Sequence, residues 1–91
     1  MSNIQSRDLF NIIGNNIKYY RKLYNLKKGK MTQEQLAELA DVSTALIGNL
    51  ESNKIQQGVS VVTLWKISKA LEISIEKFFD DSDFSARSLD A

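Results

Sequence analysis

Residues 32–52 read TQEQLAELADVSTALIGNLES, and this stretch decides the fold. Apolar residues recur at three- and four-residue steps on both sides of a polar turn, which predicts two short helices. Thr32 and Gln35 have the spacing of a capping box, in which each side chain bonds the backbone N–H of the other residue. We therefore expect the first of these two helices, which is the second helix of the chain, to begin at Thr32. Its inward side is expected to hold Leu36, Leu39 and Ala40.

The second helix of the stretch is expected to begin at Ser43, whose hydroxyl can cap it. Asp41 stands where the chain must turn sharply, and aspartate tolerates the left-handed conformation better than most residues. Asn53 is the next candidate for a left-handed helix end. Two short helices joined by a tight turn make a helix-turn-helix, in which the second helix projects into the major groove of DNA.

The rest of the chain also predicts helices. Apolar spacing indicates that the first helix of the chain covers residues 9–28, although Gly14 weakens this prediction. Ser60 can cap a fourth helix with Val61 on its core face, and Ser74 a short fifth helix that ends at Phe78 and Phe79. We find no strand pattern, so the fold class is all-α with five helices. We expect a flexible N-terminus over residues 1–8, one domain over residues 9–79 and a disordered acidic tail over residues 80–91.

Composition excludes several classes of function. The 91 residues are enough for one domain, and the 43% of hydrophobic residues suits a small packed core. The chain contains no cysteine and no histidine, which removes thiolate metal sites, the commonest general base and the commonest metal ligand. We therefore expect no catalytic residues, no metal, no cofactor and no small-molecule ligand. Without a signal-peptide pattern or an apolar run of ~18 residues, we expect a cytoplasmic protein with no membrane partner.

Charge is distributed unevenly along the chain. Residues 1–54 carry eight Lys or Arg against five Asp or Glu, whereas residues 55–91 carry four against six. A polyanion would be attracted to the first part and repelled by the second. The alternative is an ordinary solvated surface with uneven charge.

Two segments together carry a resemblance to a known family. MTQEQLAELADVSTALIGNLESNK, followed by SVVTLWKISKALEISIEKFF, resembles the Cro/repressor-type helix-turn-helix proteins of prokaryotes and phages, the XRE family. The opening IGNNIKYYR also matches, so the resemblance spans residues 13–79. It implies a five-helix lambda-repressor-like domain. It also implies a sequence-specific, repressor-like transcriptional regulator that inserts residues 43–51 into the major groove of double-stranded DNA, as a homodimer on a palindromic operator.

The resemblance also assigns roles to residues. Arg21 and Glu51 match an ion pair that ties the first helix to the third, the alternative being two unrelated surface charges. Asn49 is the best candidate reader of a base, because a carboxamide can pair with N6 and N7 of adenine. The base-contacting positions are Thr44, Ala45, Gly48 and Asn49. The phosphate-contacting positions are Thr32, Gln33, Ser43, Asn53 and Lys54.

Some features depart from the family pattern. The base-facing side chains are short, so direct readout is expected to be modest, with DNA shape and dimer spacing supplying the rest. Asp41 replaces the usual turn glycine, and the basic residues 24–31 are an insertion. The insertion either lengthens the first helix or forms an arm that reaches the DNA backbone. The possible dimer surface is Trp65, Phe78 and Phe79, although Trp65 could instead complete the core.

The alternative function is a protein-interaction module of the same fold, such as an antitoxin or adaptor, with weak or no specific DNA binding. Small residues on the third helix and the acidic tail favour this alternative.

Overall fold

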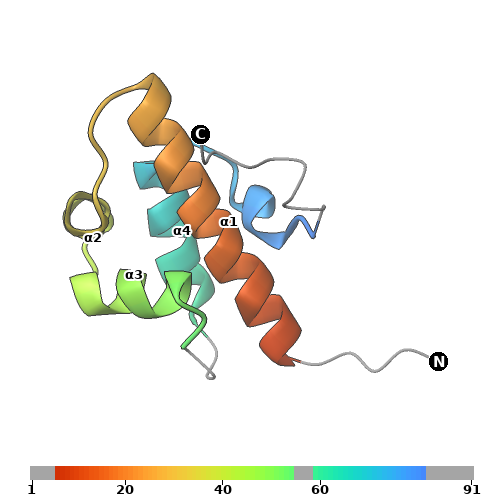
Figure 1. Cartoon of the computed structure of the whole chain (residues 1–91). Helices are drawn as coiled ribbons and strands as arrows, with labels where there is room; N and C mark the ends of the chain where they lie inside the picture. Colours follow the sequence, from red (N-terminus) through yellow and green to blue (C-terminus); the bar gives the residue numbers. More distant parts are fainter. Residues whose placement is uncertain (1–5, 55–58, 82–91) are drawn as a thin grey trace.

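The computed structural model describes residues 6–54 and 59–81, and these form helices only (Figure 1). The predicted all-α class is confirmed, with a difference at the last element. Four α-helices are followed by a short 3-10 helix, η1, where a fifth helix was expected. The elements are α1 (Ser6–Lys27), α2 (Gln33–Ala40), α3 (Thr44–Glu51), α4 (Val61–Ala70) and η1 (Ile75–Phe79).

The expected domain limits are only partly covered by the described residues. The helix α1 begins at Ser6, so residues 6–8 belong to it and not to a separate N-terminal segment. Residues 1–5 and 82–91, which make up most of the expected flexible N-terminus and acidic tail, lie outside the described residues.

Polar caps define where the short helices begin. The capping box of α2 is confirmed: the Gln35 backbone N–H donates to Thr32 Oγ1 at 3.1 Å, and the Thr32 N–H donates to Gln35 Oε1 at 2.9 Å. Ser43 Oγ accepts from the Leu46 N–H at 3.1 Å at the start of α3. The expected cap at Ser74 is wrong, because its hydroxyl bonds the carboxylate of Glu76 and caps no backbone N–H.

The turn between α2 and α3 has the expected conformation. Asp41 lies in the left-handed region with φ 57°, and its N–H donates to the Glu38 carbonyl at 3.2 Å. The Val42 N–H donates to the Ala37 carbonyl at 3.0 Å, which closes the end of α2. Asn53, after α3, is also left-handed, with φ 60°. The tight turn of the helix-turn-helix is therefore built as the sequence predicts.

The core lies where α1, α2, α3, α4 and η1 meet. The predicted inward residues Leu36 and Ala40 are buried, but Leu39 is 62% exposed and that prediction is wrong. Ala37 is also buried on the inward face of α2. Val61 is also exposed, at the first position of α4. The buried apolar residues are Ile13, Ile17, Met31, Leu36, Ala37, Ala40, Ile47, Leu50, Leu64, Ile67, Leu71 and Phe78.

A glycine lets α1 approach α3. A Cβ built on Gly14 would collide with the backbone carbonyl oxygen of Leu50, which belongs to α3. The helix α1 nevertheless runs through Gly14 without a break. Gly14 therefore allows α1 to pack closely against α3, although glycine has a low helix propensity.

A buried amide ties the C-terminal part of the domain to α1. Asn16 is fully buried, and its Nδ2 donates to the carbonyl oxygens of Phe78 at 2.9 Å and Asp80 at 2.8 Å. These bonds hold η1 against α1, and both elements also contact the rest of the core (Figure 1). The first part of the expected tail, at Asp80, is thus fixed to the domain.

Candidate nucleic-acid interface

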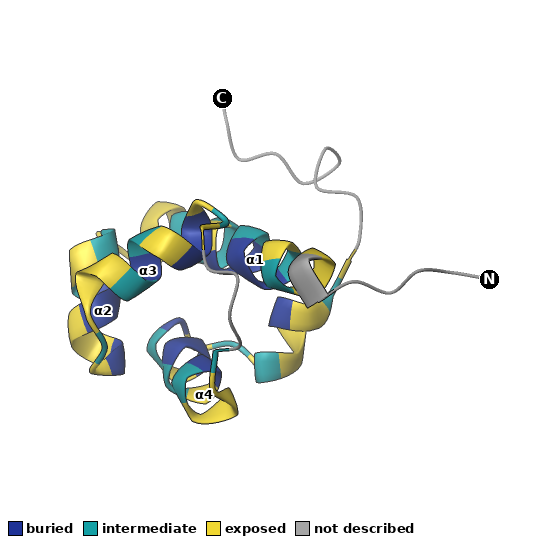
Figure 2. Cartoon of the chain, turned by 90° about the horizontal axis from the view of Figure 1, so that it is seen from below, coloured by how far each residue is buried: buried dark blue, intermediate teal, exposed yellow. Residues whose placement is uncertain are grey.

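The outer face of α3 is open to solvent (Figure 2). Thr44, Ala45 and Asn49 are exposed and Gly48 is half-buried, while Ile47 and Leu50 on the other side are buried in the core. All four predicted base-contacting residues therefore lie together on one accessible face. Short side chains there allow another surface to approach the helix backbone.

A bidentate ion pair holds α3 from behind. Arg21 Nε lies 2.7 Å from Glu51 Oε2, and Arg21 Nη2 lies 2.9 Å from Glu51 Oε1. Glu51 is only 5% exposed, so the two expected partners are joined away from bulk water. The remaining guanidinium nitrogen, Arg21 Nη1, donates to the Met31 carbonyl at 3.1 Å. One arginine side chain thus links α1, the α1–α2 connection and the end of α3.

Gln33 joins this cluster, which the sequence did not indicate. Its Nε2 donates to Glu51 Oε1 at 3.0 Å, so the amide group is held between α2 and α3. Its Oε1 would lie 3.5 Å from a Cβ built on Gly48, which places Gln33 beside the outer face of α3. No local pattern links Gln33 to Glu51, because only the packing of α2 against α3 brings the two side chains together.

The other predicted phosphate-contacting residues lie at the ends of α2 and α3. Thr32 and Ser43 are the N-caps of these helices, where free backbone N–H groups and the positive end of the helix dipole favour an anion. After α3, Lys54 is exposed. Asn53 Nδ2 donates to Asn15 Oδ1 at 3.5 Å. The side-chain oxygen of Asn53 is buried and has no hydrogen-bond partner among the described residues.

The predicted dimer surface is divided by the structure. Phe78 is fully buried inside its own chain, so its assignment to a dimer surface is wrong. It fills the core between α1 and η1, where Asn16 holds its carbonyl oxygen. Trp65 and Phe79 are 52% and 43% exposed, so these two remain on the surface. The alternative that Trp65 completes the core is also excluded by this exposure.

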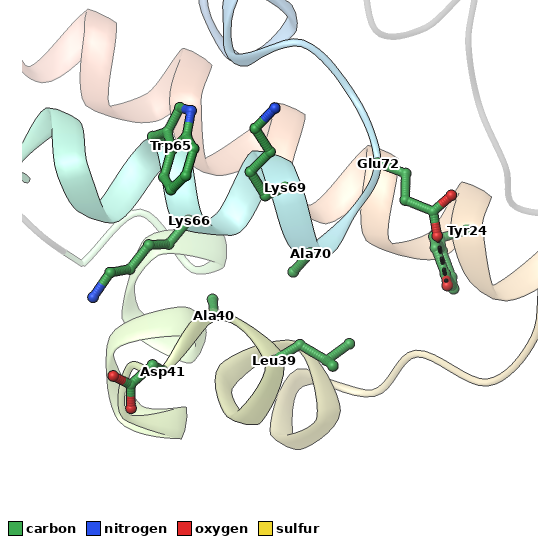
Figure 3. A pocket seen from close by; sticks show the side chains of 9 residues that line it. All are labelled: Tyr24, Leu39, Ala40, Asp41, Trp65, Lys66, Lys69, Ala70 and Glu72. Atoms are coloured by element: carbon green, nitrogen blue, oxygen red, sulfur yellow. Dashed lines mark hydrogen bonds between the residues drawn. The ribbon is translucent and has the colours of Figure 1, made fainter.

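Trp65 borders a hollow of about 520 Å³ between the end of α2 and α4 (Figure 3). Leu39 lines the α2 side of the hollow, and Lys69 Nζ lies 5.5 Å from the centroid of the Trp65 ring. The exposed Leu39 and Trp65 thus belong to the same region. This region is distinct from the outer face of α3.

Part of the basic insertion is engaged by the loop after α4. Lys28 Nζ lies 2.9 Å from Glu72 Oε1. The Tyr24 hydroxyl donates to Glu72 Oε2 at 3.2 Å, as Figure 3 shows. The hydrogen bond and positive charge of Lys28, and then the Tyr24 hydroxyl, lower the pKa of Glu72. The first half of the insertion, residues 24–27, lengthens α1, which was one of the two expected alternatives. The rest of the insertion connects α1 to α2.

The exposed outer face of α3, the packing of α2 against α3 and the tight turn between them define a helix-turn-helix domain. A family model described as helix-turn-helix matches residues 17–78, more than half of the chain. The chain belongs to this family, the XRE-type helix-turn-helix proteins, and is a DNA-binding transcriptional regulator.

One solved structure adds to this result. This chain is similar to the restriction-modification controller protein C.AhdI from Aeromonas hydrophila, whose crystal structure is known. The two share 28% sequence identity, and the two structures match with a TM-score of 0.65. The match covers 79% of this chain and 97% of C.AhdI. No curated protein matches the chain. Across the described ranges, none of the helices combines the length and apolar character needed to cross a membrane.

Proposed function

We propose that the protein is a sequence-specific, repressor-like regulator that inserts α3 into the major groove of double-stranded DNA in the cytoplasm. The observation that carries this proposal is the exposed face of α3, held from behind by the Arg21–Glu51 ion pair and by Gln33. A reading helix must keep a fixed angle to the duplex, because its side chains must meet base edges at hydrogen-bond distance.

Four residues of α3 would meet the bases. Asn49 would bond adenine through its carboxamide, and Thr44 would bond a base or touch a thymine methyl. Ala45 offers only a methyl contact, and Gly48 leaves room for the duplex. One good bidentate contact supplies ~1–3 kcal/mol of discrimination, so much of the specificity would come from DNA shape and from half-site spacing.

The phosphate contacts would flank this face on both sides. Thr32, Gln33 and Ser43 lie at the starts of α2 and α3, and Asn53 and Lys54 follow the end of α3. Contacts of this kind fix the register of the protein on the duplex without reading sequence. Because they release counterions, binding should weaken steeply as the salt concentration rises.

A homodimer would supply the second half-site. One helix reads only a few base pairs, so two copies bound about one helical turn apart, ~34–36 Å, provide affinity and recognise a palindrome. The exposed Trp65 and Phe79 are the candidate contacts between copies. A protein-interaction module without specific DNA binding is the second candidate, favoured by the exposed Leu39 and Trp65 beside the hollow between α2 and α4.

Selection of bound duplexes from a random pool tests the leading proposal. We expect a recovered palindrome whose half-sites are ~10–10.5 base pairs apart. Gel shifts on that duplex should show that Asn49→Ala lowers affinity for the selected sequence and relaxes preference at one base pair. The matched control is Asn11→Ala, which removes an exposed asparagine from α1.

The outcome that contradicts the proposal is equally clear. If selection recovers no common sequence, and both variants bind every duplex as the parent does, the protein is not a sequence-specific regulator. In that case the protein-interaction module becomes the leading candidate function.

A further inference from the structure

The side-chain amide of Gln33 has a fixed orientation beside the outer face of α3. Its Nε2 donates to Glu51 Oε1 at 3.0 Å, and two Arg21 nitrogens hold the same carboxylate at 2.7 and 2.9 Å. An ionised carboxylate only accepts hydrogen bonds, so the nitrogen of the amide must face Glu51 and the oxygen cannot. The buried ion pair thus determines which side of the amide carries the donor and which side carries the acceptor.

Gly48 gives this amide its place at the outer face of α3. A Cβ built on Gly48 would have Gln33 Oε1 as its neighbour, at 3.5 Å. A long side chain at position 48 would therefore compete with the Gln33 amide for the same space. Gln33, which belongs to α2, thus supplies a polar group at a position where α3 itself has no side chain.

Two hydrogen-bonding positions of the Gln33 amide remain unused. Its Oε1 accepts no hydrogen bond from residues 6–54 and 59–81, and the side chain is only half-buried. The amide nitrogen has two protons, and Glu51 takes one of them. The amide therefore keeps one acceptor and one donor for a molecule that approaches α3.

We propose that the Gln33 side chain is a further specificity-determining residue, which bonds N6 and N7 of an adenine in the major groove. One acceptor and one donor match this base edge, because N6–H₂ donates and N7 accepts. A phosphate offers only acceptors and would leave Gln33 Oε1 without a partner. This assignment rests on the proposed function, because the adenine belongs to the duplex that α3 enters.

The start of α2 keeps its phosphate contact in this arrangement. The capping box uses the N–H groups of Thr32 and Gln35, so those of Gln33 and Glu34 remain for an anion. The backbone of Gln33 then helps to position the protein on the strand, while its side chain reads a base. Because 3.6 residues make one helical turn, position 48 points about 100° away from Asn49. Gln33 and Asn49 therefore read different base pairs.

Selection of bound duplexes from a random pool, repeated with Gln33→Met, tests this assignment. Methionine keeps the length of the side chain and removes its hydrogen bonds, while Arg21 still holds Glu51. The preference for adenine at one position of each half-site should fall roughly 5- to 150-fold, which is the effect of losing one bidentate contact. Preference at the base pair read by Asn49 should not change. The matched control is Glu34→Ala, which removes the exposed next residue of α2 and should alter preference at no position.

A modified base provides a second measurement. Replacing the selected adenine with 7-deazaadenine removes the N7 acceptor and leaves the base pair intact. The parent should bind this duplex more weakly than the unmodified one, whereas Gln33→Met and Gln33→Ala should each bind the two duplexes equally. Thermal unfolding of the variants shows whether the domain is still folded, and the comparison of duplexes with the parent needs no variant.

The results that overturn the assignment are distinct from those that overturn the proposed function. If the parent selects an operator and Gln33→Met keeps every base preference, Gln33 reads no base and the proposed function stands. The same conclusion follows if Gln33→Met weakens preference equally at all positions, because Gln33 then acts only by positioning α3. If the parent selects no common sequence, the proposed function fails and this assignment fails with it.

Discussion

At the scale of single residues, Glu51 joins α1, α2 and α3 behind the candidate interface. Its carboxylate is almost fully buried and accepts from two Arg21 nitrogens and from Gln33. Removing one partner of a buried pair leaves an uncompensated charge, which typically costs ~3–5 kcal/mol. The ion pair therefore fixes the end of α3 to α1.

We expect Glu51→Ala to lower the free energy of unfolding by ~3–5 kcal/mol, because the Arg21 guanidinium loses its partner. Urea denaturation followed by circular dichroism measures this change. Glu38→Ala is the matched control on the exposed part of α2, and it should change stability by no more than ~0.5 kcal/mol. Equal effects of the two substitutions would contradict the role of the ion pair.

Gly14 and Gly48 give opposite predictions for the same substitution. Gly14→Ala should destabilise the domain by ~1–3 kcal/mol, because the new Cβ collides with the Leu50 carbonyl and forces α1 and α3 apart. Gly48→Ala meets only Gln33 Oε1 at 3.5 Å, so it should stabilise α3 by up to ~1 kcal/mol through helix propensity. Thermal unfolding of both variants checks the pair, and a tolerated Gly14→Ala would contradict the close approach.

At the scale of elements, the sequence predicted the caps and the turn of the helix-turn-helix better than it predicted which apolar side chains are buried. Thr32, Ser43 and Asp41 act through local hydrogen bonds and backbone conformation, which depend on neighbours in sequence and can be read from it. Leu39 and Val61 were placed inward because they are apolar. Their exposure depends on which neighbouring helix covers that side, and periodicity within a short helix does not determine this.

The same distinction applies to the candidate site. The ion-pair partners Arg21 and Glu51 could be anticipated because a family resemblance supplied their pairing. The bond from Gln33 to Glu51 and the bonds from Asn16 to η1 join residues far apart in sequence. No local pattern encodes them, because they arise only when whole helices are packed.

The turn between α2 and α3 offers a test at this scale. Asp41 has φ 57°, a conformation that glycine adopts without a Cβ penalty. Asp41→Gly should therefore change stability by less than ~1 kcal/mol, because relief of strain is offset by the larger entropy of the unfolded chain. Asp41→Val should destabilise clearly, since β-branched residues are genuine outliers there. Chemical denaturation compares the two, and a stable valine variant would contradict the turn geometry.

At the scale of the whole molecule, an exposed cluster joins the end of α1 to the loop between α4 and η1. Glu72 accepts from Lys28 and Tyr24, and its own backbone is left-handed with φ 59°. The pKa of Glu72 is lowered, mainly by the hydrogen bond and charge of Lys28. The folded state therefore binds a proton at this carboxylate less readily than the unfolded chain does.

This lowered pKa predicts a pH dependence. Above the unfolded pKa of Glu72, near 4.5, its contribution to stability is present, and it is lost as pH falls through the lower folded pKa. The parent should thus be more stable than Glu72→Gln near neutral pH, and the difference should vanish in more acidic solution. Denaturation of both proteins from neutral to acidic pH tests this, and a difference that does not depend on pH would contradict it.

The two hydrogen bonds of Asn16 have a consequence for synthesis on the ribosome. The carbonyl groups that satisfy this buried amide come from residues translated 62 and 64 positions later. A nascent chain that stops short of Phe78 leaves the amide unsatisfied and the underlying apolar side of α1 uncovered. The domain therefore reaches its finished form only after the chain has emerged as far as Asp80, and shortened products that end within η1 should be substrates for cellular proteases.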